Sequence, residues 1–309
     1  TSPMFTVNFG SGTPEKAAKW VKHVNINKKA NVKYWEVGNE LYGDWHPYFC
    51  SAKEYGERAA EFIRQMKAVD PTILVTVVWV LEGSWNEEVF EYTKDLADGV
   101  NVHHYPQHAG EENDAALLAA PSSLNEIIPG VYRQLEEYGT PGKKYELWLT
   151  EWNSVDFKPG PQTLSVVNAL FVADYLGTLA ELNIDQASYW DIHNDITEQG
   201  GDYGYLSRAG APDGDNVPRP SYWAFKMASE SLRGKLMKSS TNNENVTSYF
   251  TENEGVRSLM IINKLPETKA VTNIAIPGFT GDAVKKQLHS GNEKAGYSSE
   301  NIMLKTGQT

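Results

Sequence analysis

The chain has 309 residues, and its 40 acidic and 28 basic side chains give a formal net charge of −12. This acidic excess argues against binding along a phosphate backbone, which requires a basic surface. Hydrophobic residues make up 40% of the chain and charged residues 22%, as in a folded globular protein, and the single cysteine, Cys50, excludes an intrachain disulfide and a multi-cysteine metal site.

From the N-terminus, short β-branched or aromatic runs alternate with amphipathic helical segments, a pattern typical of βα units around a parallel sheet. In chain order the expected strands are Met4–Asn8, Val32–Val37, Ile73–Trp79, Val100–Tyr105, Glu146–Thr150 and Gln186–Asp191. The first expected helix begins at Thr13-Pro14-Glu15. The other expected helices cover about Ala52–Val69, Trp85–Leu96, Ser122–Tyr138, Leu164–Leu182 and Tyr222–Leu232.

The long loops follow the strands and are rich in Trp, His, Asp and Gly. This favours a TIM-type (β/α) barrel, whose active site lies at the C-terminal ends of its strands. A doubly wound sheet is the alternative, but the sequence has no G-x-G-x-x-G motif.

The pattern changes after Gly234, where helical segments stop. Short strands separated by Asn, Gly and Pro turns are expected at Val246–Phe250, Ser258–Ile262, Val271–Ile276 and Ala283–Leu288. We therefore expect a barrel domain over residues 1–236 and a small antiparallel β-sandwich over residues 237–309.

Two of the expected strands end in a glutamate with Trp and Asn nearby. The segments are Tyr34-Trp35-Glu36-Val37-Gly38-Asn39-Glu40 and Glu146-Leu147-Trp148-Leu149-Thr150-Glu151-Trp152-Asn153. A single glutamate of this kind is usually a helix cap or a salt-bridge partner, but parallel strands can bring Glu40 and Glu151 to one rim. Two such carboxyl groups are the equipment for glycoside hydrolysis, in which one protonates the leaving oxygen and the other attacks the anomeric carbon or activates water. Glu36 shares strand parity with Glu40 and is expected to be a structural, hydrogen-bonded partner.

These segments resemble glycoside hydrolase clan A, and most of all the α-L-arabinofuranosidase and endoglucanase relatives in or near family 51. The resemblance runs from about Val7 to Leu232 and also includes Val102-His103-His104-Tyr105-Pro106 and Tyr189-Trp190-Asp191. It implies a retaining glycoside hydrolase that acts on plant cell-wall polysaccharide, as an endo-β-1,4-glucanase (cellulase) or an α-L-arabinofuranosidase, without a cofactor.

The resemblance also implies roles for single residues. Glu40 corresponds to the general acid/base and Glu151 to the nucleophile. Asn39 resembles the amide that binds the hydroxyl next to the reacting carbon, Tyr105 the donor to the nucleophile, and Trp190 the platform under the reacting sugar. Further candidate substrate-binding residues are Asn8, His104, Trp45, Trp79 and Trp152.

The chemistry adds two expectations of its own. An acid/base must be neutral before bond cleavage, so we expect burial and the nearby Glu151 charge to raise the pKa of Glu40. Adjacent histidines on a strand point to opposite faces, so His103 and His104 are not expected to bind a metal ion together.

The motif order makes Met4–Asn8 the third strand of the eight-stranded clan barrel, so the first two βα units are absent from this chain. A six-stranded sheet exposes two edges. The chain is then a fragment or processed product, a shortened and distorted barrel, or a protein whose edges a second copy covers, and we expect the homo-oligomer. The expected partner is an oligo- or polysaccharide, with neither nucleic acid nor membrane, and the alternative function is a non-catalytic carbohydrate-binding remnant.

Overall fold

The computed structural model describes residues 2–265, 274, 281–290 and 295–304, and the fold divides into two compact units. The first unit consists of Thr1–His104, Asn125–Trp152 and Ile184–Ser188. The second consists of Tyr105–Leu124, Asn153–Asn183 and Tyr189–Thr309.

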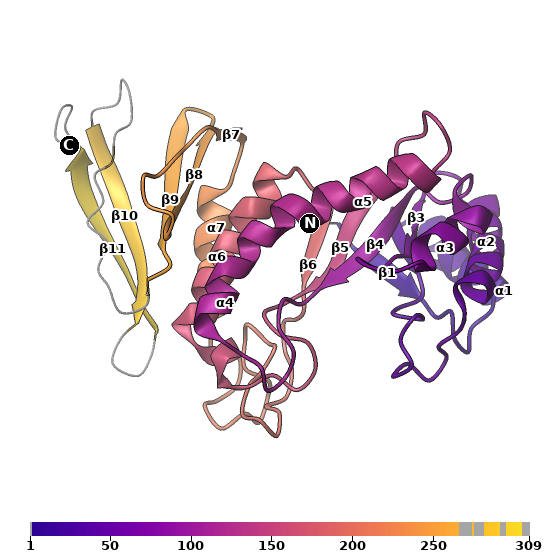
Figure 1. Cartoon of the computed structure of the whole chain (residues 1–309), viewed down its shortest axis with the longest axis horizontal. Coiled ribbons are helices and arrows are strands. Elements are labelled where there is room, and N and C mark those ends of the chain that lie inside the picture. Colours follow the sequence, from indigo (N-terminus) through magenta and orange to yellow (C-terminus); the bar gives the residue numbers. More distant parts are fainter. Residues whose placement is uncertain (1, 266–273, 275–280, 291–294, 305–309) are drawn as a thin grey trace. The chain divides into compact units, whose positions relative to one another are not determined.

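The first unit is built on a six-stranded sheet with its strands in chain order (Figure 1). The strands are β1 (Met4–Val7), β2 (Tyr34–Val37), β3 (Leu74–Val78), β4 (Gly99–His104), β5 (Glu146–Trp152) and β6 (Gln186–Tyr189). Strands β1 to β5 pair in parallel with their neighbours. The sheet is a half-barrel of the TIM type, which confirms the predicted fold class.

The helices of this unit follow the strands, as the βα pattern predicts. They are α1 (Pro14–Val21), the π-helix η1 (Lys22–Asn27), α2 (Ala52–Val69), α3 (Trp85–Thr93) and α5 (Leu124–Tyr138). Polar caps begin two of them: the Thr13 hydroxyl accepts from the Lys16 amide, and the Ser51 hydroxyl accepts from the Glu54 amide. Their apolar faces cover a core of large side chains from both layers, such as Trp35, Tyr55, Phe62 and Phe90.

The two edge strands of the sheet approach each other at their N-terminal ends. Gln186, the first residue of β6, donates from Nε2 to the sulfur of Met4, the first residue of β1, at 3.1 Å. The ladders described for the sheet do not include one between β1 and β6. At this end the sheet is therefore curled like a shortened barrel.

The second unit contains the remaining helices and the antiparallel strands. The helices are α4 (Asp114–Ala119), η2 (Ala120–Ser123), η3 (Pro161–Leu164), α6 (Val166–Glu181) and α7 (Pro220–Ser231). Strands β7 (Lys235–Met237), β8 (Val246–Asn253) and β9 (Val256–Asn263) form one antiparallel sheet, and β10 (Gly281–Ser290) pairs with β11 (Ala295–Leu304).

The sheet of β7, β8 and β9 packs on the helices of its own unit. Tyr249, Met260 and Ile262 form a small buried core against Leu170 and Ala173 of α6. The Tyr249 hydroxyl donates to the carboxyl group of Asp174 at 2.7 Å.

Several details differ from the sequence-based expectation. Helix α4 and strand β7 were not expected, and the domain boundary proposed between residues 236 and 237 falls within β7. The expected strand Val271–Ile276 lies outside the described residues, apart from residue 274. None of the helices in the described ranges is both long and apolar enough to cross a bilayer.

Candidate active site

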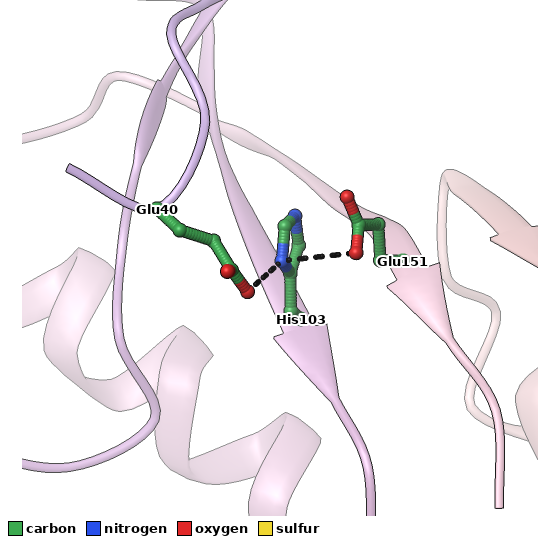
Figure 2. Close-up of side chains that lie close together, drawn as sticks. All are labelled: Glu40, His103 and Glu151. Carbon is green, nitrogen blue, oxygen red and sulfur yellow. Dashed lines mark hydrogen bonds and ion pairs between the residues drawn. The ribbon is translucent and has the colours of Figure 1, made fainter. Parts of the chain in front are cut away.

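Three side chains converge at the C-terminal ends of β2, β4 and β5 (Figure 2). His103 Nδ1 lies 2.7 Å from Glu40 Oε1 and 3.6 Å from Glu151 Oε2. One ligand atom from each of the three residues lies within 4.8 Å of the others. The side chains are 7% exposed for His103, 22% for Glu40 and 17% for Glu151, so this cluster is largely shielded but still open to solvent.

A β-bulge sets the face on which Glu151 lies. In the ladder between β4 and β5, Val102 pairs with Leu149, but the next pair is His103 with Glu151, so Thr150 is an extra residue. Without this shift Thr150 would pair with His103, and Glu151 would pair with His104 on the opposite face, because side chains alternate along a strand. The bulge therefore places the Glu151 carboxyl group beside His103.

The turn after β2 directs the Glu40 carboxyl group. Gly38 has φ +79°, and a Cβ there would lie 2.5 Å from the Leu41 side chain, so this position requires glycine. Glu40 itself has φ +48°. Its carboxyl group accepts from Trp45 Nε1 at 3.0 Å and from the Tyr42 hydroxyl at 3.3 Å, in addition to its contact with His103.

The electrostatics of the cluster place the proton on His103. Burial raises the pKa of Glu40, but the hydrogen bond and charge of His103, with the hydrogen bonds from Trp45 and Tyr42, outweigh it and leave the pKa below its ordinary value. Burial lowers the pKa of His103, yet its hydrogen bond to Glu40 and the charges of Glu151 and Glu40 leave it raised. This corrects the expectation of a raised Glu40 pKa: imidazole is the more basic group, so it takes the proton.

Glu36 lies on β2, four residues before Glu40 in the chain. It is 3% exposed and accepts a hydrogen bond from the Thr6 hydroxyl. Burial raises the pKa of Glu36, while Thr6, the charge of His103 and Thr150 act in the opposite direction. These contacts fit the structural role expected for it.

Asn8 and Asn39 line a pocket of about 330 Å³ next to Glu40. Asn39 is half-buried, and Asn8 is exposed, with its side-chain oxygen accepting from the amides of Ser11 and Gly12. Trp45 is 67% exposed. These three candidate substrate-binding residues are thus accessible in the first unit.

Other candidates are placed differently. Trp79 and Trp152 are each 1% exposed, and the ring of Trp79 packs on that of Phe90 with 4.6 Å between centroids. This corrects the expectation that the two tryptophans line a cleft, because neither offers a face to a ligand.

The histidine of the site is also corrected from His104 to His103. His104 is buried on the other face of β4, and burial lowers its pKa to about 4. Sequence reasoning missed His103, although strand parity offered a signal: His103 shares its face with the polar Asn101, and His104 shares its face with Val100 and Val102.

Tyr105 and Trp190 belong to the second unit. The Tyr105 ring lies 6.4 Å from that of Tyr203. Trp190 is 42% exposed, and its carbonyl oxygen accepts from the Asn153 side chain. Their roles at the reacting sugar stay predictions.

A metal ion has one candidate position in the described part of the chain. Within the described residues, one group of three Asp, Glu, His or Cys side chains has its ligand atoms within 4.8 Å of one another, and it consists of Glu40, His103 and Glu151. One imidazole nitrogen and two carboxylate oxygens suit zinc. Such an ion would replace the proton between His103 and Glu40.

Comparison with known proteins identifies similar proteins that are named as arabinofuranosidases. No model of a known protein family matches the chain. It is 32% identical over 222 residues to the probable alpha-L-arabinofuranosidase C of Aspergillus fumigatus, a match that covers 60% of this chain and 44% of that protein. It is 29% identical over 143 residues to the intracellular exo-alpha-(1->5)-L-arabinofuranosidase of Acetivibrio thermocellus, covering 43% and 28%. The chain thus spans less than half the length of the curated relatives it matches.

Solved structures share the fold over nearly the whole chain. An alpha-L-arabinofuranosidase from Thermotoga maritima, solved as an arabinose complex, superimposes with a TM-score of 0.81 at 22% identity, covering 99% of this chain and 72% of that one. A family 51 alpha-L-arabinofuranosidase from Bifidobacterium longum gives a TM-score of 0.75 at 17% identity, with coverage of 99% and 72%. By its curated relatives and by its fold, the chain is similar to the family 51 α-L-arabinofuranosidases of glycoside hydrolase clan A.

Proposed function

We propose that this chain is a retaining α-L-arabinofuranosidase in which Glu40 is the general acid/base and Glu151 the nucleophile. The observation that carries the proposal is that the two carboxyl groups share His103, with ligand atoms within 4.8 Å. Retaining enzymes hold their two carboxyl groups about 5–5.5 Å apart, whereas inverting enzymes leave about 6.5–9.5 Å for a water molecule. The similarity to arabinofuranosidases supports arabinofuranose as the sugar that is released. Plant cell-wall polysaccharide is the proposed substrate from which it is released.

His103 stores the proton that the reaction needs. Moving this proton from His103 Nδ1 to Glu40 Oε1, across 2.7 Å, gives a neutral acid and a neutral imidazole without changing the net charge of the cluster. A bound sugar excludes water, which disfavours the ion pair relative to this neutral form. Glu40 is then ready to act as an acid.

Two displacements complete the reaction. Glu40 protonates the leaving oxygen while Glu151 forms a bond to the anomeric carbon, and the leaving group departs as an alcohol. Glu40 next accepts a proton from water, which attacks the same carbon and releases Glu151. Asn39 binds the hydroxyl next to the reacting carbon.

A hydrolysis screen tests this function. The unaltered protein, Glu151→Ala and Glu40→Ala are assayed on an aryl arabinofuranoside, carboxymethyl-cellulose and xylan, with Glu61→Ala on the exposed face of α2 as control. We expect hydrolysis of the arabinofuranoside with retained configuration in the first product, and a loss of at least ~10³-fold in Glu151→Ala. Unchanged hydrolysis by Glu151→Ala would refute the assignment, and cleavage of carboxymethyl-cellulose would favour an endoglucanase.

A carbohydrate-binding protein without turnover is the second candidate. It is favoured by the edges of β1 and β6, whose strands form no ladder with each other in the described sheet. Binding of an arabino-oligosaccharide in the absence of any hydrolysis by the unaltered protein would establish it.

The same edges motivate the proposal of a homo-oligomer, in which a second copy pairs with β1 or β6. Light scattering should then give a mass of at least twice 34.5 kDa. A mass equal to one chain, with full activity, would contradict it.

A further inference from the structure

A pocket of about 330 Å³ lies beside Glu40 in the first unit. Its walls come from the end of β1, the segment directly after β1 and the loop that follows β2, and they include Asn8, Asn39, His46 and Tyr48. Asn39 directly precedes Glu40 in the chain. The volume is at the lower end of the ~300–1,000 Å³ of small-molecule pockets, so it suits a ligand of sugar size rather than a long polymer.

Tyr48 offers an aromatic face that is held in place by its neighbours. Its ring lies against Gly10, where an added Cβ would be 2.3 Å from the ring. The residue is 50% exposed. The Tyr48 amide donates to His46 Nδ1 at 3.1 Å, so the proton of the neutral imidazole is on Nε2, which is left as a donor. An aromatic face beside polar groups is suited to a sugar ring.

The polarity of the pocket limits what it can hold. None of its lining residues is Asp, Glu, Lys or Arg, so a charged ligand would lose its hydration without gaining a partner. The Nε2 donor of His46 is available for the hydroxyl groups of a ligand in this pocket. The pocket therefore suits an uncharged, hydroxyl-rich ligand.

We propose that this pocket is the subsite for the uncharged sugar residue on the leaving-group side of the scissile bond, an inference that rests on the proposed function. Its lining comes from both sides of Glu40 in the chain, but none of it comes from β4 or β5, which carry His103 and Glu151. In the proposed reaction Glu40 protonates the leaving oxygen and Glu151 attacks the anomeric carbon from the other side. The leaving sugar therefore lies on the side of Glu40, where this pocket is.

Two substrates with the same reacting sugar separate this subsite from the rest of the site. An arabino-oligosaccharide has a sugar as its leaving group, whereas arabinofuranosyl fluoride has no ring to occupy the pocket. For Tyr48→Ala and His46→Ala we expect kcat/KM on the oligosaccharide to fall by about 10-fold, mainly through KM, with little change on the fluoride. Phe49→Ala is the matched control, since Phe49 is exposed in the same loop but does not line the pocket.

The outcomes distinguish this subsite from the proposed function. Equal losses on both substrates, or no loss on either, would overturn the subsite. If the unaltered protein hydrolyses neither substrate, calorimetric titration of Glu151→Ala with the oligosaccharide decides: weaker binding after adding Tyr48→Ala, but not Phe49→Ala, supports the subsite, and equal binding refutes it.

Discussion

His103 of β4 pairs with Glu151 of β5, although the preceding pair, Val102 with Leu149, would lead one to expect Thr150 as the partner of His103. The bulge at Thr150 creates this partnership, and it turns a residue that simple alternation would place with His104 toward the shared imidazole. Glu40 approaches the same nitrogen from β2 at 2.7 Å. The proton shared by His103 and Glu40 therefore lies near the charge of a second carboxyl group, Glu151, and measurable consequences follow from its position.

The first consequence concerns the pH dependence of hydrolysis. We expect His103→Asn to lower kcat/KM by about 10²–10⁴-fold, the usual contribution of a positioned proton donor. The raised pKa of His103 keeps the shared proton in place to higher pH, and without the imidazole Glu40 must hold it alone. The alkaline limb of the kcat/KM profile should therefore move to lower pH. His23→Asn, at an exposed position, is the control, and an unmoved limb would contradict the shared proton.

A separate prediction concerns stability and Glu36. Burial raises the pKa of this carboxyl group, so the folded state binds its proton more tightly than the unfolded state does. Its stabilising contribution is then present below the unfolded pKa and is lost as the pH rises through the folded pKa. Glu36→Gln removes this loss and should raise the melting temperature at pH 8 by roughly 2–4 °C, with no gain near pH 4. Thermal scans across pH test this, with Glu61→Gln as control; a gain that is the same at both pH values would contradict it.

The buried Trp79 and the exposed Trp45 should differ in what their replacement by alanine does to stability and to activity. Trp79→Ala empties a buried position and should cost about 3–5 kcal/mol in urea denaturation. Trp45→Ala should leave the denaturation midpoint nearly unchanged, because the side chain is 67% exposed. It should nevertheless lower kcat/KM on the order of 10-fold, because Glu40 loses the hydrogen bond from Nε1. Equal stability losses for the two variants would refute this division.

The second consequence of the shared proton is sensitivity to zinc. Zn²⁺ should inhibit hydrolysis by binding Glu40, His103 and Glu151, and a chelator should restore activity. Inhibition should weaken as the pH falls, since the metal competes with protons for these ligands. Mg²⁺, which prefers oxygen ligands in octahedral geometry, is the control ion. Zinc inhibition that persists undiminished in the residual activity of His103→Asn would place the ion elsewhere.

Much of the fold could be predicted because its signals are local. The boundaries of α2 and the starts of β1 and β5 agree with the sequence-based prediction, since caps, prolines and hydrophobic periodicity act within a few residues. Helix α4 and strand β7 were missed because each is short and lies in a segment without a clear period.

For the site, the sequence by itself determined that Glu40 and Glu151 follow strands of one parallel sheet, and hence that both carboxyl groups reach the same rim. Only the tertiary structure decided the rest. The bulge at Thr150 selects the face of Glu151, and packing separates the buried Trp79 from the exposed Trp45. The contact between His103 and Glu40 raises the pKa of the imidazole and lowers that of the carboxyl group, so that His103 holds the proton. These features depend on contacts between distant segments, which no local pattern of residues encodes.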